Sequence, residues 1–234
     1  MMYPRVAVLL AAYKGHKYIY EQVLSLLGQC GVSVDIFIRV DGDDNLFSNE
    51  VIQLAMDYEN IHFLKGDLIS SPSSNFYKLV LEMEDYSFDY YALCDQDDIW
   101  SNYKLNRAIA SFSNNLIQGY SSGFTTFNSS GRKKIYKLGK KTEFDHLFQS
   151  AGPGCTFVLN IEALIFLQNF LKDNHSLLEV LAHDWLIYFV FRVNKMEWVL
   201  DEESHLFYRQ HNANVAGVNS GLAAKVKRFR LLFS

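Results

Sequence analysis

Three carboxylates fall within four positions in the stretch Asp95-Gln96-Asp97-Asp98, directly after the apolar run 90–94. Two such charges about 4 Å apart repel by roughly 4 kcal/mol at an effective dielectric constant near 20. In an extended segment Asp95 and Asp97 share a face, and oxygen ligands at this spacing suit Mg²⁺ or Mn²⁺ with positions left open for phosphate. A solvated acidic turn has the same local sequence, so the motif alone leaves both interpretations open.

A second constellation, His183-Asp184-Trp185, interrupts an apolar pattern of helical spacing over 177–191. Burial raises the proton affinity of a carboxylate, which suits Asp184 to act as a general base. The alternative is an aspartate on the exposed stripe of an amphipathic helix, or one held by a structural partner.

A third, Tyr208-Arg209-Gln210-His211, puts Arg209 and His211 on one side if it is extended. Arginine binds phosphate oxygens through two parallel hydrogen bonds, and histidine can ligate a metal. The alternative is that both side chains are exposed to solvent and bind nothing. Asp41, which ends the alternating segment 32–40, suits a hydrogen bond to a base or ribose, or a simple Asp-Gly turn.

The elements that must position these residues follow a β-α rhythm. Periodicity predicts strands over 6–13, 32–40, 61–64 and 90–94, separated by helices near 19–27, 51–58 and 76–83, the last with Asn75 as a candidate cap. This alternation predicts a single α/β domain with a doubly wound, mostly parallel central sheet flanked by helices. Ligands of such sheets bind beyond the carboxyl ends of the strands, so the loops after Ala12, Val40 and Cys94 should converge.

The second half of the chain has a looser pattern. It predicts a helix over 104–112, short strands over 123–128 and 155–159, and helices over 162–171 and 177–191. A break at Gly152-Pro153-Gly154 precedes the second of these strands. We find no internal repeat and no linker, so residues 1–217 are interpreted as one domain followed by a tail, 218–234.

Composition bounds the class of protein. Of 234 residues 49% are hydrophobic, the net charge is −4, and three cysteines stand apart without a Cys-x-x-Cys pair. The hydrophobic content predicts a sizeable core, and the isolated cysteines indicate a reducing cytoplasm. We expect no nucleic-acid partner, and no apolar run approaches the roughly 20 residues of a membrane span. Residues 221–234 hold four basic residues among apolar ones and no acid. This tail suits peripheral contact with an anionic membrane on its inner face, or a solvated or subunit-packing helix.

Taken together, these segments resemble a family 2 glycosyltransferase of the glycosyltransferase-A fold over roughly residues 4–217. The residues that carry the resemblance are VAVLLAAYKGHKYIYEQVLSLLGQ, VDGDD, SSNFYKL, CDQDDIW, AGPGCTFVLN, HDWLIY and YRQHNANVAG. D-Q-D-D-I-W, H-D-W and Y-R-Q-H-x-x-N are similar in particular to the bacterial rhamnosyltransferase-like branch. Lys14 stands where that pattern has Asn, and Val40-Asp41-Gly42-Asp43 replaces its D-D-G-S.

The resemblance implies a metal-dependent, inverting transfer of rhamnose or a related hexose to a saccharide acceptor, expected to be lipid-linked, during synthesis of a bacterial surface polysaccharide. dTDP-rhamnose is favoured as donor over a UDP-sugar, with Mg²⁺ or Mn²⁺ as cofactor. Residues 1–100 would bind the donor and 101–217 the acceptor. Asp184 would be the catalytic base, and Asp97 and His211 the metal ligands. The implied donor contacts are Ala11, Tyr13, Asp41, Asn75, Asp95, Gln96 and Arg209, and the residues on the acceptor or donor-sugar side are Asp98, Trp100, Gly154, His183 and Trp185.

Two other functions are compatible with an α/β scaffold of this kind. A sugar-nucleotide pyrophosphorylase would need a glycine-rich phosphate loop after the first strand, where Ala11-Ala12-Tyr13-Lys14-Gly15 offers one glycine. A catalytically silent member would bind carbohydrate or a partner protein, and only turnover separates it from an enzyme.

Overall fold

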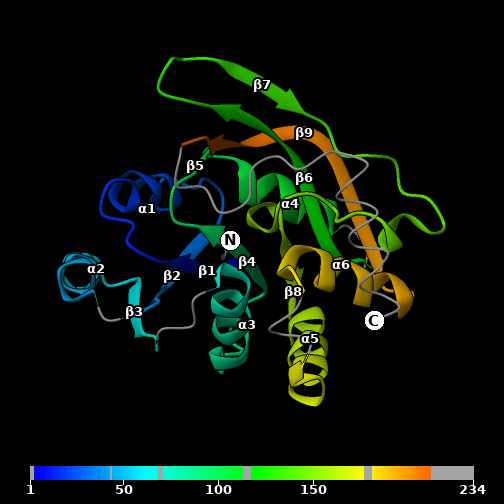
Figure 1. The fold of residues 1–234 in the computed structure, drawn as a ribbon, viewed down its shortest axis with the longest axis horizontal. Coiled ribbons are helices and arrows are strands. Elements are labelled where there is room, and N and C mark those ends of the chain that lie inside the picture. The colour runs from blue at the N-terminus through cyan, green and yellow to red at the C-terminus, as the bar shows by residue number, and fades with distance from the viewer. Residues whose placement is uncertain (1–2, 43, 68–70, 113–116, 177–180, 212–234) are drawn as a thin grey trace.

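A mixed sheet with the strand order β3-β2-β1-β4-β8-β6-β9-β5 forms the centre of the fold (Figure 1). The structure is a computed structural model and describes residues 3–42, 44–67, 71–112, 117–176 and 181–211. The first four strands in this order run parallel to one another, namely β1 (Arg5–Ala12), β2 (Ser33–Val40), β3 (Ile61–Lys65) and β4 (Tyr90–Asp95). These confirm the strands expected from the first half of the sequence.

The second half of the sheet adds antiparallel neighbours. The short strand β8 (Val158–Asn160) lies antiparallel between β4 and β6 (Ile117–Phe127), and β9 (Glu197–Arg209) runs parallel to β6. Two further strands, β5 (Ile99–Trp100) and β7 (Lys133–Tyr136), pair antiparallel with β9 and β6. The long strand β9 runs beside β6 and ends at Arg209, whose amide donates to Asp98 in the loop after β4.

Helices cover both faces of the sheet, as expected for a doubly wound fold. On one face α1 (Ile19–Leu27), α2 (Asn45–Asp57) and α4 (Lys104–Ser111) share a core with Val6, Val8 and Leu10 of β1. On the other face α3 (Pro72–Glu82), α5 (Ile161–Asp173) and α6 (His183–Val193) share a second core with Ala7 and Leu9. Alternate residues of β1 therefore enter different cores, because successive strand side chains point to opposite faces.

Several expected boundaries are wrong. The helix expected over 177–191 includes neither Leu181 nor Ala182 and begins at His183, while 177–180 lie outside the described residues. Asp184 therefore sits in the first helical turn, where the backbone amides favour a negative charge. The cap of α3 is Ser71, whose hydroxyl accepts from the amide of Ser74, so Asn75 is an interior residue of that helix.

The strands of the second half also differ from expectation. β6 is longer than the predicted 123–128, and the predicted strand 155–159 is split into the 3-10 turn η2 (Gly154–Thr156) and β8. No helix within the described ranges combines the length and hydropathy of a membrane span. The basic tail 218–234 lies outside the described residues.

Candidate functional site

The ends of the parallel strands meet at one edge of the sheet. Ala11 of β1 is level with Arg39 of β2 and with Asp95 of β4. The amide of Tyr13 donates to Gln96 Oε1 at 2.7 Å, and Gln96 Nε2 donates back to the Tyr13 carbonyl at 2.8 Å. Gln96 thereby fastens the loop after β1 to the loop after β4, and the expected convergence of these loops is confirmed.

The loop after β2 joins the same edge. The amide of Asp41 donates to the Ala12 carbonyl at 2.8 Å, and only 4% of Asp41 is exposed. Beneath it Asn75 Oδ1 accepts from Arg39 Nη1 at 2.8 Å, and Asn75 Nδ2 donates to the Ala12 carbonyl at 3.4 Å. Asn75 therefore ties α3 to the ends of β1 and β2. The buried Arg39 was not found in the sequence, where it reads as the polar member of an alternating strand.

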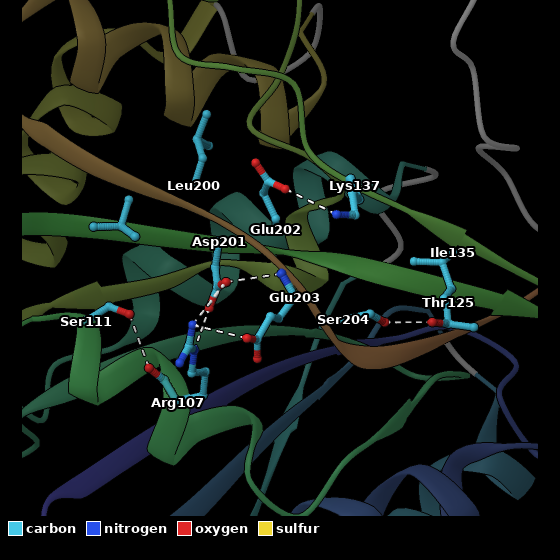
Figure 2. Close-up of a pocket in the computed structure, with 11 residues that line it drawn as sticks. Arg107, Ser111, Thr125, Ile135, Lys137, Leu200, Asp201, Glu202, Glu203 and Ser204 are labelled. Atoms are coloured by element: carbon cyan, nitrogen blue, oxygen red, sulfur yellow. Dashed lines mark hydrogen bonds and ion pairs between the residues drawn. The ribbon is translucent and has the colours of Figure 1, made fainter.

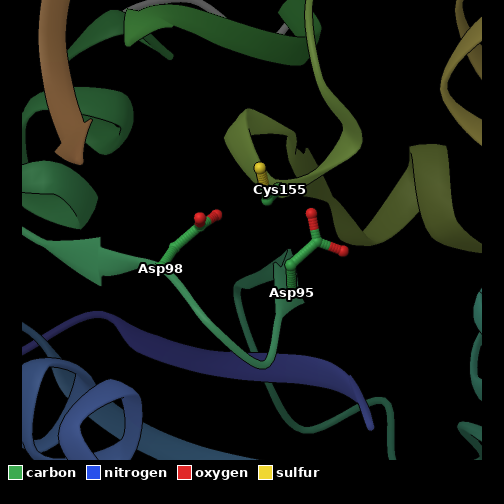
Figure 3. Close-up of side chains that lie close together, drawn as sticks. All are labelled: Asp95, Asp98 and Cys155. Carbon is green, nitrogen blue, oxygen red and sulfur yellow. The ribbon is translucent and has the colours of Figure 1, made fainter. Parts of the chain in front are cut away.

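Residues 95–98, at the end of β4 and just after it, form a segment that we call the acidic loop. Two of its carboxylates face a buried thiol (Figure 3). One ligand atom each of Asp95, Asp98 and Cys155 lies within 4.8 Å of the others. Burial, followed by the charge of Asp97, raises the pKa of Asp95, and burial followed by Asp95 raises that of Asp98. Burial also raises the pKa of the Cys155 thiol, so the sulfur stays protonated. A protonated thiol is a poor ligand for Mg²⁺ or Mn²⁺, which prefer oxygen.

Asp97 points instead toward His211, just beyond the end of β9. His211 Nε2 lies 2.7 Å from Asp97 Oδ2, and the His211 ring stacks on Tyr18 with centroids 4.8 Å apart. A carboxylate and an imidazole side by side are a donor set that suits Mn²⁺ and accepts Mg²⁺. The structure thus brings the two predicted metal ligands together. Tyr18 was not singled out, although it belongs to the motif that carries the family resemblance.

Arg209 braces the acidic loop from the end of β9. Its Nε donates to the Asp97 carbonyl at 2.8 Å, and its amide donates to Asp98 Oδ1 at 3.2 Å. The guanidinium carbon lies 4.7 Å from the ring centroid of Tyr18 and 4.6 Å from that of Phe127. Glu21 of α1 forms an ion pair with the guanidinium. These contacts shape the loop, and a diphosphate contact of Arg209 stays a prediction.

The first turn of α6 is fixed by α3. Ser73 Oγ accepts from the amide of His183 at 3.2 Å and lies 3.3 Å from its Nδ1, while the His183 ring stacks on Phe76 at 4.2 Å. A Cβ atom added to Gly154 would lie 2.1 Å from His183 Nε2, so position 154 requires glycine. His183 and Gly154 are therefore packed against each other beside Asp184.

Asp184 lies within electrostatic range of the acidic loop. Its charge adds to burial and to Asp97 in raising the pKa of Asp95, and it adds to burial in raising that of Tyr77. One carboxylate oxygen, Oδ1, accepts from the amide of Trp185 at 2.7 Å. Asp184 is half-buried, so its remaining surface can receive a proton from a ligand. Asp184 is therefore close enough to Asp95 to influence its charge, and a shared site with Asp97 and His211 stays a prediction.

The two tryptophans predicted for the sugar side are core residues. Trp100 and Trp185 are 1% and 2% exposed, so neither presents a ring face to a ligand in this structure. Trp185 Nε1 donates to the His146 carbonyl at 2.9 Å. The ammonium of Lys104 lies 3.4 Å from the ring centroid of Trp100, and burial lowers the pKa of Lys104 to about 8. Asp98, 1% exposed, also faces inward.

A buried ion pair holds the segment before Gly154 against α6. Asp145, in the 3-10 turn η1 (Asp145–Leu147), accepts from Tyr188 at 2.6 Å and from Arg192 Nη1 at 2.7 Å. Arg192 Nη2 also donates to the Thr142 carbonyl at 2.9 Å. This network fixes the orientation of α6, and with it the position of Asp184.

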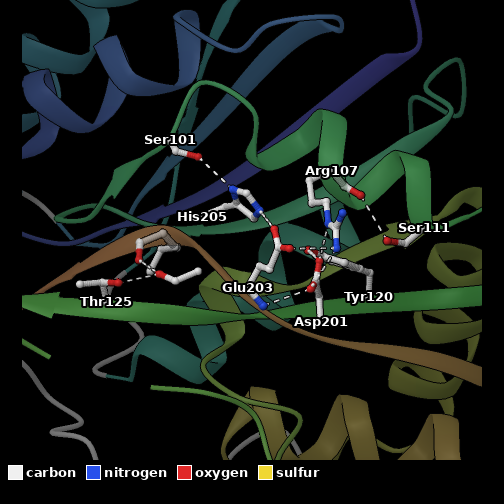
Figure 4. A network of polar contacts seen from close by, with 10 residues as sticks. Ser101, Arg107, Ser111, Tyr120, Thr125, Asp201, Glu203 and His205 are labelled. Carbon is white, nitrogen blue, oxygen red and sulfur yellow. Dashed lines mark hydrogen bonds and ion pairs between the residues drawn. The ribbon is translucent and has the colours of Figure 1, made fainter. Parts of the chain in front are cut away.

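A separate groove of about 850 Å³ opens beside the irregular part of β9 (Figure 2). Its charged groups are already paired: Arg107 Nε lies 2.8 Å from Asp201 Oδ2, and Lys137 Nζ lies 3.2 Å from Glu202 Oε2. Tyr120 also donates to Asp201, at 3.0 Å, within a wider polar network (Figure 4). None of the predicted site residues lines the groove, so it is distinct from the site at the strand ends.

Comparison with known proteins gives no match to a family model. A curated protein, "dTDP-rhamnosyl transferase RfbG" from Shigella flexneri, is 33% identical over 227 residues, which cover 95% of this chain and 78% of that protein. Identity at this level over nearly the whole chain indicates common descent rather than a shared fold alone.

Solved structures share the fold at lower identity. S. aureus TarS 1–349 in complex with UDP-GlcNAc superposes with a TM-score of 0.63 at 15% identity, over 92% of this chain and 62% of that one. The mannosyltransferase PcManGT from Pyrobaculum calidifontis, in complex with GDP-Man and Mn²⁺, gives 0.63 at 11% identity, over 92% and 59%. The chain thus spans about three fifths of the length of these structures. They support the glycosyltransferase-A fold.

Proposed function

The chain belongs to the family 2 glycosyltransferases, in their rhamnosyltransferase-like branch, and from this premise we propose that it transfers rhamnose from dTDP-rhamnose to a saccharide acceptor with inversion. The observation that carries the proposal is the meeting of three elements at one sheet edge. Asp97 with His211, Asp95 at the end of β4, and Asp184 at the start of α6 come from distant parts of the sequence.

A divalent cation fits the acidic loop on the chemistry of its donor set. Asp97 and His211 would hold it, with Asp95 in support. Bound there, the cation would neutralise the diphosphate leaving group of the donor. Without a positive charge, the carboxylates of this loop and a diphosphate would repel one another. We propose Mg²⁺ or Mn²⁺ on this ground, and the Mn²⁺ complex of the mannosyltransferase supports the choice.

Asp184 would accept the proton of the acceptor hydroxyl as that oxygen forms a bond to the anomeric carbon. The bond from the anomeric carbon to the diphosphate breaks on the opposite face, so a single displacement inverts the configuration. Ser73, Phe76 and Tyr188 serve this step indirectly, because they hold α6 in place through His183 and Asp145. The half-buried setting of Asp184 limits competition by water for the proton.

Calorimetric titration with dTDP, UDP and GDP, each with and without Mn²⁺, tests the donor. Tighter binding of dTDP that depends on Mn²⁺ is expected. Preference for UDP or GDP would keep the glycosyltransferase and replace the sugar donor. Absence of binding for all three would contradict the proposal and favour a silent scaffold. A pyrophosphorylase is set aside, since the chain belongs to a different family.

The acceptor is proposed to be a lipid-linked saccharide of a bacterial surface polysaccharide, reached from the cytoplasmic face of the membrane. The basic and apolar character of residues 221–234 supports this location. Sedimentation with anionic liposomes compares the full chain with one that ends at Gly221. A loss of sedimentation in the shorter chain is expected, and equal sedimentation of both would remove the membrane contact from the proposal.

A further inference from the structure

Two residues other than glycine have a left-handed backbone within the described part of the chain. Lys14 has a φ of 49° and Lys195 a φ of 59°. This region crowds the Cβ atom against the backbone, whereas glycine and asparagine tolerate it. At both positions an asparagine would therefore be the less strained residue.

The strain alone does not identify a functional residue, as Lys195 shows. Lys195 lies in the turn between α6 and β9, where its amide donates to the Arg192 carbonyl at 3.1 Å. Left-handed residues commonly end helices in this way. No residue of the candidate site contacts Lys195 in any of the interactions described for it, so it serves as a matched comparison for Lys14.

Lys14 is held against the acidic loop on both sides. Before it, Tyr13 makes two hydrogen bonds to Gln96. After it, a Cβ atom on Gly15 would lie 2.3 Å from Gln96 Oε1 and 2.9 Å from the Phe47 ring. The backbone at 13–15 therefore has little freedom, and the exposed residue Lys14 stands between two residues that are held against Gln96.

The charges around Lys14 indicate what it could bind. Its ammonium lies 5.1 Å from the Tyr13 ring centroid, and within the described ranges it forms no ion pair. Arg209 of the site already pairs with Glu21, whereas Lys17, whose ammonium lies 5.2 Å from the Tyr18 ring centroid, is a second lysine near this edge. An anion that enters this edge meets Lys14 as a side-chain cation without a carboxylate partner.

We propose that Lys14 binds the diphosphate of the nucleotide donor and so contributes to donor affinity. This inference rests on the proposed function. A lysine ammonium offers three donors to phosphate oxygens, and a diphosphate carries enough charge to hold it. The proposed contact would account for a strained lysine at this position, because the bound donor gains a charged hydrogen bond that asparagine would not provide.

Calorimetry with dTDP and with dTMP, both with Mn²⁺, tests the inference on Lys14→Asn, Lys14→Arg and Lys195→Asn. Both asparagine variants should raise the melting temperature by about 2–4 °C, because each relieves a left-handed lysine. Only Lys14→Asn should lower the affinity for dTDP, by about tenfold, and it should lower the affinity for dTMP less. Lys14→Arg keeps the charge and should retain most of the affinity for dTDP.

The possible results separate cleanly. Unchanged dTDP affinity in a stabilised Lys14→Asn would show that the lysine has no role in donor binding. Equal losses of affinity for dTDP and for dTMP would overturn the proposal that Lys14 contacts the diphosphate. A wild-type protein that binds no dTDP would remove the proposed donor, and this inference with it. Normal wild-type binding with an unaffected variant overturns the inference alone.

Discussion

The Nε2 atom of His211 lies 2.7 Å from Asp97 Oδ2, although the two residues are 114 positions apart. The end of β9 brings them together, and both side chains are mostly buried, at 19% and 14% exposure. The same two atoms are the candidate metal ligands. A cation that binds them must replace the direct contact between ring and carboxylate and any proton shared by that pair.

Asp97→Asn should abolish the effect of Mn²⁺ on dTDP binding. The amide keeps the size of the side chain and a contact with His211, but it removes the charge that attracts the cation. We expect a loss of at least about 30-fold in affinity for dTDP with Mn²⁺ present, on the scale of lost ligand interactions. Calorimetry measures it, and Asp57→Asn, at the exposed last residue of α2, is the control. Retention of the Mn²⁺ effect would place the cation elsewhere.

Asp184→Asn should bind dTDP normally and transfer sugar at least about 100-fold more slowly, as expected for loss of a general base. The substitution leaves the hydrogen bond to the Trp185 amide available through the amide oxygen. Release of dTDP from dTDP-rhamnose in the presence of acceptor measures transfer. Asp173→Asn, on the exposed end of α5, should have no effect. A normal rate in Asp184→Asn would mean that another group takes the proton.

Loss of the buried ion pair at Asp145 should destabilise the fold. Asp145→Ala leaves Arg192 buried without its carboxylate and removes the acceptor of Tyr188, so the free energy of unfolding should fall by about 3–5 kcal/mol. Urea unfolding measures this. Glu202→Ala breaks an exposed pair with Lys137 and should cost less than about 1 kcal/mol. Equal losses in both variants would contradict the importance of burial.

Lys104 should make stability rise with pH above neutrality. Burial lowers its pKa to about 8, below the value near 10.5 of an unfolded lysine. Between these values the unfolded chain binds more protons than the folded one, so unfolding becomes less favourable as the pH rises from about 8 to about 10.5. Lys104→Met removes this component. Urea unfolding of both proteins at pH 7.5 and 9.5 measures it, and an identical pH response would contradict a lowered pKa.

The first half of the fold could be predicted from the sequence because its order is local. Each strand from β1 to β4 is an apolar or alternating run, a helix follows each of β1, β2 and β3, and strands of this kind end at a common edge. The candidate site follows from that rule for Asp41 and 95–98. Arg39 and Tyr18 were missed, since their partners Asn75 and Arg209 are distant in sequence and no local pattern indicates such pairs.

The second half was harder to predict for identifiable reasons. β9 pairs with β6 through register shifts near Ser122 and Gly123, and such irregularities interrupt the two-residue period of a strand. The start of α6 was misplaced because the apolar pattern of 177–191 continues across its boundary. The family resemblance put Trp100 and Trp185 on the sugar side, yet residue type does not reveal whether a ring faces solvent or the core.

The parallel pairing of β6 with β9 also has a consequence for how the protein folds during synthesis. Tyr120 and Asp201, which this pairing joins, are 81 positions apart, so a long loop must close before the contact forms. The pairings of β1 with β2 and of β2 with β3 close shorter loops and can form earlier. Arg209 and His211 therefore reach the acidic loop late. A nascent chain can acquire its nucleotide-side sheet well before it acquires a complete site for the donor and the cation.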